Sequence, residues 1–181
     1  MLLNKILLLA GTALATPTWP EKLDTRTTMS VDGTLYCGIF ASGDRTTASG
    51  LLTDLDAGAN GKVAHSSFTI PSGGCERVHC WDTTGIYACN DDSKAITLSG
   101  NDIWAVVNHV FKICCQEIVD MFGATGPGLS GQKFIRGTGE NWNAVIAYGN
   151  CRSSNTIKPS DAGGWNVNPV CEGGDSNPYD S

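Results

Sequence analysis

Eight cysteines constrain the fold of this 181-residue chain more than any other feature. In an oxidising compartment, an even set of cysteines of this size predicts up to four disulfide bonds, which can support a small, loop-rich domain. A metal site through Cys75, His79 and Cys80 is the competing interpretation, but the second ligand pair that zinc fingers supply is missing. We therefore expect a disulfide-stapled domain that uses Cys37, Cys75, Cys80, Cys89, Cys114, Cys115, Cys151 and Cys171.

Residues 1–15 have the pattern of a cleavable secretory signal peptide. Lys5 supplies a positive charge, residues 6–10 form an apolar core, and Ala13 and Ala15 provide a small-x-small cleavage site. The apolar run is shorter than the roughly 20 residues that cross a bilayer. A buried N-terminal helix or strand is the alternative. We expect a secreted, extracellular protein whose residues 16–33 form an exposed arm.

Composition argues against two classes of partner. The net charge is −6, and the 12 Lys and Arg residues are spread singly along the chain. Nucleic acids and anionic membranes attract clustered positive charge. We therefore expect no nucleic-acid partner. We also expect no stable membrane insertion, because no later stretch is long and apolar enough, and we expect a monomer with no cofactor and no metal.

Residues 75–89 predict a β-hairpin. Two runs rich in β-forming residues flank Asp82-Thr83-Thr84-Gly85, in which Asp and Gly favour a tight turn. If Asp82 lies opposite Gly85, Cys80 lies opposite Tyr87 and Val78 lies opposite Cys89. Because side chains alternate across a strand, those four residues would share one face, which we assign to the core.

A long amphipathic helix is predicted over residues 101–122. Ser99 and Asp102 form a capping-box pattern, apolar residues recur every three or four positions from Ile103 to Met121, and Gly123 follows. Cys114 and Cys115 point about 100° apart on such a helix and so need different partners. We therefore expect a disulfide from one of them to the hairpin, at Cys75, Cys80 or Cys89.

The remaining segments complete an α+β fold. Residues 34–40, 63–70, 131–136 and 142–148 are interpreted as strands, and residues 41–61 as loop with at most one helical turn. We expect an antiparallel sheet of about four to six strands, packed by one long helix. The domain is placed at residues 34–151, and residues 152–181 form a Gly-, Ser- and Pro-rich tail pinned by Cys171.

Three histidines could carry chemistry: His65, His79 and His109. A pairing of His65 or His79 with Glu76 or Glu140 could support general acid–base cleavage of RNA or sugar. No nucleophile-elbow, metalloprotease or Ser-x-x-Lys motif is present. We assign no catalytic residue and favour a protein that is not an enzyme. A hydrolase would need one of these histidines beside a carboxylate in a cleft.

Trp81 is the candidate partner-binding residue, because it lies next to the predicted hairpin turn. Tryptophan rings at such positions often anchor protein partners. Core packing is the commoner role of a tryptophan, and it is the alternative for Trp81.

The residues just described resemble a group of small cysteine-rich secreted proteins of filamentous fungi. The resemblance rests on Cys75-x4-Cys80, the Thr84–Asp91 block, the Cys114-Cys115 pair, and the segments 130–134 and 142–151. More distantly, the chain is similar to killer-toxin-like and necrosis-inducing effectors of plant-associated fungi. The resemblance implies a secreted effector, a virulence or host-interaction protein that binds a host or competitor protein in the host apoplast. A killer-toxin-like antimicrobial protein is the alternative, although killer toxins are typically basic.

Overall fold

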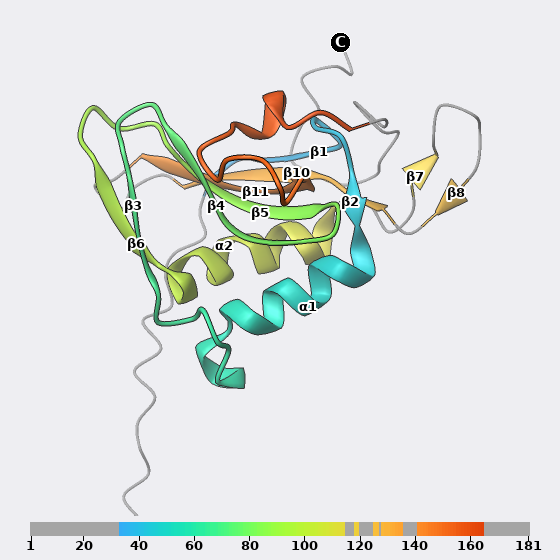
Figure 1. Ribbon diagram of the computed structural model, residues 1–181, viewed down its shortest axis with the longest axis horizontal. Coiled ribbons are helices and arrows are strands. Elements are labelled where there is room, and N and C mark those ends of the chain that lie inside the picture. The colour runs from blue at the N-terminus through green and yellow to red at the C-terminus, as the bar shows by residue number, and fades with distance from the viewer. Residues whose placement is uncertain (1–32, 115–117, 120–124, 127, 136–140, 165–181) are drawn as a thin grey trace, which may run out of the picture.

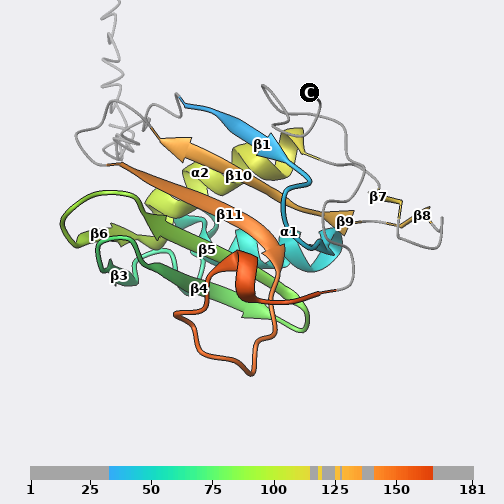
Figure 2. The same cartoon turned by 90° about the horizontal axis from the view of Figure 1, so that it is seen from above.

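The computed structural model describes residues 33–114, 118–119, 125–126, 128–135 and 141–164 (Figure 1). Its main sheet has five antiparallel strands in the order β1-β10-β11-β5-β4 (Figure 2). The α+β class and the antiparallel sheet are confirmed. The strands are β1 (Leu35–Cys37), β10 (Gly131–Ile135), β11 (Trp142–Tyr148), β5 (Thr84–Asn90) and β4 (Cys75–Trp81).

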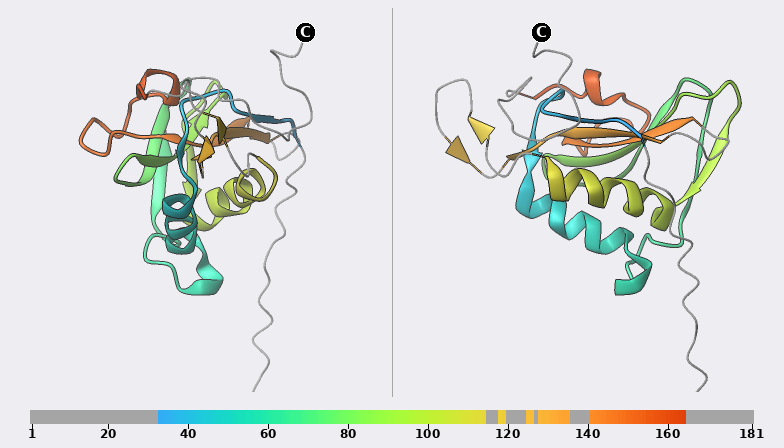
Figure 3. Two further views of the ribbon diagram at one scale, coloured as in Figure 1. Left: turned by 90° about the vertical axis from the view of Figure 1, so that its right-hand side faces the viewer. Right: turned by 180° about the vertical axis from the view of Figure 1, so that it is seen from behind.

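Two helices, α1 (Arg45–Leu55) and α2 (Gly100–Ile113), lie against one face of this sheet (Figure 3). The expected single long helix is therefore wrong. Short strands form three further pairs, β2 (Gly43–Asp44) with β9 (Gly128–Leu129), β3 (Ser67–Ile70) with β6 (Ile96–Ser99), and β7 (Ile118–Val119) with β8 (Thr125–Gly126). Two 3₁₀ turns, η1 (Ala57–Ala59) and η2 (Pro159–Asp161), complete the described elements.

Helix α2 begins as predicted and ends early. Ser99 Oγ accepts from the Asp102 amide, and Asp102 Oδ2 accepts from the Ser99 amide, so the capping box is confirmed. The backbone leaves the helix at Cys114, which has extended torsion angles. Cys114 forms a disulfide with Cys37, and Arg45 donates to the carbonyls of Phe111 and Cys114. These long-range contacts end the helix at Ile113, although the apolar periodicity of the sequence continues beyond that residue.

Helix α1 corrects the expectation of a loop at residues 41–61. Asp44 caps it by accepting from the Thr47 amide at 2.6 Å. Its buried residues Leu51, Leu52 and Leu55 join the core that α2 and the sheet also supply. Burial against these elements stabilises a helix whose small polar residues favour it only weakly.

The β4–β5 hairpin is confirmed, but its predicted register is wrong. Trp81 pairs with Thr84, which makes Asp82-Thr83 the two-residue turn, and Asp82 adopts a positive φ of 52°. His79 pairs with Ile86, yet Arg77 pairs with Tyr87, so Val78 is an extra residue in a β-bulge.

The bulge also divides residues that we expected to share one face. Val78 packs with Ile86 in the core beneath the helices. Tyr87 belongs to a second buried cluster, with Val145 and Ala147, that Ile157 and Ala162 help to cover. In Figures 1 and 2, the segment after β11 lies over this second face of the sheet. Val78 is thus separated from Tyr87, because the bulge turns it towards the helices.

Three disulfides join distant parts of the described chain. Cys37–Cys114 ties β1 to the end of α2, Cys75–Cys89 crosses the base of the hairpin, and Cys80–Cys151 ties β4 to the segment after β11. The predicted helix–hairpin disulfide is wrong, because all three hairpin cysteines have other partners. Three disulfides in a small domain are consistent with an extracellular protein.

Several expectations fall outside the described residues. They concern the signal peptide at 1–15, the arm at 16–33 apart from Gly33, the tail beyond residue 164, and the residues Cys115, Glu140 and Cys171. Among the helices that the structure does describe, none is long and apolar enough to cross a membrane.

Candidate binding site

Trp81 is the most exposed large hydrophobic side chain of the described residues. It is 71% exposed, and the next such residue is Ile113 at 46%. By contrast, Trp142 is fully buried and Trp104 packs against the core. An exposed tryptophan keeps a large apolar surface in contact with water, and covering that surface favours binding.

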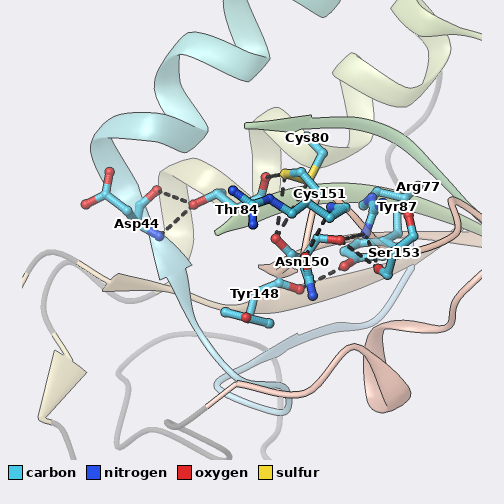
Figure 4. The surroundings of a disulfide bond; sticks show 11 residues. Asp44, Arg77, Cys80, Thr84, Tyr87, Tyr148, Asn150, Cys151 and Ser153 are labelled. Atoms are coloured by element: carbon cyan, nitrogen blue, oxygen red, sulfur yellow. Dashed lines mark hydrogen bonds between the residues drawn. A yellow bond between two sulfur atoms is a disulfide. The ribbon is translucent and has the colours of Figure 1, made fainter. Parts of the chain in front are cut away.

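The hairpin that presents Trp81 is held at both ends. The Cys75–Cys89 disulfide closes its base. Near its tip, the residue before Trp81 forms the Cys80–Cys151 disulfide, which Figure 4 shows with its surroundings. Beyond the disulfide, Arg77 donates to the backbone carbonyls of Asn150 and Ser153, both at 2.7 Å. Such restraint lowers the entropy cost of immobilising the site in a complex.

Two cavities flank Trp81. The first, which we call the His79 cavity, has a volume of about 480 Å³. The second, which we call the Arg152 cavity, has a volume of about 710 Å³ and lies on the turn side of Trp81, with Asp82, Tyr148 and Arg152 in its wall. Thr47 and Trp81 line both cavities. The surface around Trp81 is therefore hollowed on two sides.

One wall of the His79 cavity comes from α1. Thr47, Gly50, Leu51 and Asp54 stand at positions i, i+3, i+4 and i+7 of α1 and so lie along one side of the helix. The opposite wall comes from β4, where the turn register places His79 and Trp81 opposite Ile86 and Thr84. Paired residues point to the same face, and Ile86 faces the helices. His79 consequently points towards α1.

Asp54 connects the polar groups of the His79 cavity. Its Oδ2 atom lies 2.8 Å from His79 Nε2 and 2.9 Å from Lys62 Nζ. Partial burial tends to raise the pKa of Asp54, but hydrogen bonds from His79 and Lys62, with their positive charge, outweigh it. The pKa of Asp54 therefore lies below its usual value. At neutral pH the carboxylate is ionised, so it accepts hydrogen bonds and has no proton to give.

The structure pairs the sequence-predicted residues differently. His79 does lie beside a carboxylate, but that carboxylate is Asp54, whose place on α1 was not predicted. Glu76 instead accepts from Asn155, and His65 is exposed in the turn before β3. His109 is half-buried on α2. The helical periodicity of residues 45–55 is the signal that locates Asp54, because it puts Asp54 on the same side of a helix as Thr47.

The alternative metal site is wrong, because Cys75 and Cys80 are both in disulfides. Within the described ranges, no group of three or more His, Cys, Asp or Glu side chains could hold a metal ion. No protein-family model, curated protein or solved structure matches this chain significantly.

Proposed function

We propose that this protein is a secreted fungal effector that binds a host or competitor protein through the surface around Trp81. It acts outside the cell, in the host apoplast, as a monomer and without catalysis. The observation that carries the proposal is the 71% exposure of Trp81 between two cavities, on a hairpin held by two disulfides. Tryptophan is enriched among the residues that dominate protein–protein binding energy.

The chemistry of the His79 cavity favours binding over catalysis. General acid–base cleavage uses separate groups to remove and to supply protons at the reacting bond. Here the ionised Asp54 carboxylate accepts from His79 and Lys62, so it can orient the imidazole but has no proton to supply to a reacting bond. Among the described residues that line this cavity, Asp54 is the sole carboxylate. A paired-carboxylate glycosidase mechanism has no second partner there.

The test compares two exposed hydrophobic residues. Purified mature protein is infiltrated into leaf tissue, and cell death or suppression of the oxidative burst is scored against dose. We expect Trp81→Ala to raise the effective dose at least about tenfold, because losing a central binding tryptophan costs about 2 kcal/mol or more. Ile113→Ala is the matched control and should act like the wild type. Full activity of a folded Trp81→Ala protein would refute the proposal.

A second candidate function, hydrolysis, is favoured by the presence of His79 beside a carboxylate in a cavity. Purified protein is incubated with RNA and with cell-wall polysaccharides, and products are measured for His79→Gln and for the control His65→Gln. Cleavage that only His79→Gln abolishes would establish a hydrolase. Under the binding proposal, the folded His79→Gln protein keeps most of its activity in leaves. Growth inhibition of competing microbes, without any leaf response, would support the antimicrobial alternative.

A further inference from the structure

We infer that the His79 cavity binds a neutral saccharide. This goes beyond the proposed function, because it assigns a small polyhydroxyl ligand to one of the two cavities beside Trp81. The ligand could be a free cell-wall oligosaccharide or a glycan carried by the partner protein. The two sources present the same chemistry, namely a ring with apolar C–H faces and a rim of hydroxyl groups.

The cavity offers both parts of that recognition. Trp81 supplies an exposed aromatic surface against which the apolar face of a sugar ring can pack. Beside it lie a carboxylate, an ammonium group and two threonine hydroxyls, from Asp54, Lys62, Thr46 and Thr47. A pocket with an aromatic wall and a few convergent polar groups is the usual form of a small-molecule site, and about 480 Å³ lies within the typical size range.

The polar groups retain hydrogen-bonding capacity. Both described contacts of Asp54, from His79 and Lys62, are made to Oδ2, although a carboxylate can accept at two oxygens. The Lys62 ammonium has three donors, uses one on Asp54, and its side chain is 70% exposed. Sugar hydroxyls can donate to the Asp54 carboxylate and accept from the Lys62 ammonium. Groups of both kinds lie side by side in this cavity.

Charge selects against other ligands. His79 and Lys62 are both already paired with the carboxylate of Asp54, so neither is left to bind an anion by itself. A phosphate or an acidic peptide would meet the ionised carboxylate of Asp54, and a cation would meet Lys62. The chain as a whole carries a net charge of −6, which further disfavours anions. A neutral ligand with many hydroxyls meets neither penalty.

Gly50 supports the assignment independently. It lies in the middle of α1, where glycine is unfavourable, and it lines the cavity. A Cβ atom at this position would meet no atom within 4 Å, so packing does not require the glycine. The absent side chain leaves the helix wall of the cavity open to a ligand. A longer side chain at position 50 would enter the cavity and also favour the helix.

Isothermal titration tests the inference with three probes: hexamers of β-1,4-linked N-acetylglucosamine, hexamers of β-1,3-linked glucose, and a free high-mannose N-glycan. We expect the wild-type protein to bind at least one probe. Gly50→Gln, which blocks the cavity, and Asp54→Asn, which removes the carboxylate, should each weaken binding at least about tenfold, while Ile113→Ala should not. Binding of a hexamer identifies a cell-wall source, and binding of the N-glycan alone identifies a glycoprotein source.

Two results would overturn the inference. One is a wild-type protein that binds none of the probes, and the other is binding that survives in folded Gly50→Gln and Asp54→Asn proteins. Leaf assays separate this failure from failure of the proposed function. A Trp81-dependent leaf response in a protein that binds no saccharide overturns only the saccharide site. Saccharide binding in a protein whose leaf response does not need Trp81 overturns only the proposed function.

Discussion

The three disulfides should contribute unequally to stability, because they close loops of different lengths. The cysteines are 77 residues apart in Cys37–Cys114, 71 in Cys80–Cys151 and 14 in Cys75–Cys89. A disulfide restricts the unfolded chain, and the lost entropy grows with the logarithm of the loop length. Replacing both cysteines of one pair with serine removes one restriction at a time without leaving a reactive single thiol.

The loop lengths set the expected sizes. The chain-entropy relation gives about 4.5 kcal/mol for Cys37–Cys114, about 4.4 kcal/mol for Cys80–Cys151 and about 3.0 kcal/mol for Cys75–Cys89. The hairpin loop lies inside the 37–114 loop, but shortening that loop by 14 residues changes its value by only about 0.2 kcal/mol. Each loss is large beside the roughly 5–15 kcal/mol stability of a typical domain.

Urea unfolding of the three double-serine proteins measures these losses, with the slope of each transition checked for two-state behaviour. We expect the two long-loop variants to lose similar amounts, and each to lose about 1.5 kcal/mol more than the hairpin variant. A hairpin variant that is as unstable as the other two would refute the reasoning. Native packing around β4, and not the entropy of the unfolded chain, would then dominate the contribution of the disulfide.

Three smaller perturbations follow from individual contacts. Gly50→Ala should raise the free energy of unfolding by about 0.5–1 kcal/mol in urea, because α1 gains helix propensity without a clash; a loss would contradict this. Arg45→Gln should lower the free energy of unfolding by about 1–3 kcal/mol, measured by thermal unfolding. Arg45 donates to the last carbonyls of α2, and its Cζ atom lies 4.4 Å from the centre of the Phe111 ring. Replacing the exposed Lys112 with Gln is the control and should have little effect. The lowered pKa of Asp54 means that its contribution is complete above the unfolded pKa of about 3.9 and is lost as pH falls through the folded value. The stability gap between wild type and Asp54→Asn should therefore shrink from neutral pH to about pH 2, and a constant gap would exclude this.

Local sequence signals predicted the elements that depend on local contacts. The capping box at Ser99 and Asp102 marked the start of α2, and it satisfies orphan amides within one turn. Residues 142–148 match β11 at both ends, because turn residues bound a run whose aromatic and β-branched residues favour a strand. The hairpin was predicted from the same kind of signal. None of these features requires knowledge of a distant partner.

Features that depend on distant partners were missed. The apolar periodicity of α2 continues past Ile113, but the disulfide to Cys37 and the contacts of Arg45 decide where the helix ends. Helix α1 has weak local signals and is stabilised by burial beneath the sheet. The sequence therefore gives no position for the carboxylate of Asp54 relative to the hairpin, and its pairing with His79 cannot be inferred from local signals. Cysteine pairing is nonlocal for the same reason.

The bulge at Val78 explains why strand alternation also failed at the site. The turn pairs Trp81 with Thr84, and the disulfide joins Cys75 to its strand partner Cys89. From one fixed pair to the other, with the paired residues included, β4 supplies seven residues (75–81) and β5 supplies six (84–89). One residue of β4 must therefore lack a partner, and Val78 is that residue.

Alternation counted from Cys75 alone puts Arg77, His79 and Trp81 on one face. The extra residue leaves Arg77 on the second face and turns His79 and Trp81 towards α1, where Asp54 and Thr47 lie. The cysteine spacing and the turn thus act together. The disulfide fixes the base of the hairpin, the turn fixes its tip, and the mismatch between the two creates the bulge that brings His79 to Asp54. Bulges are frequent beside functional sites for this reason, since they redirect side chains without breaking the sheet.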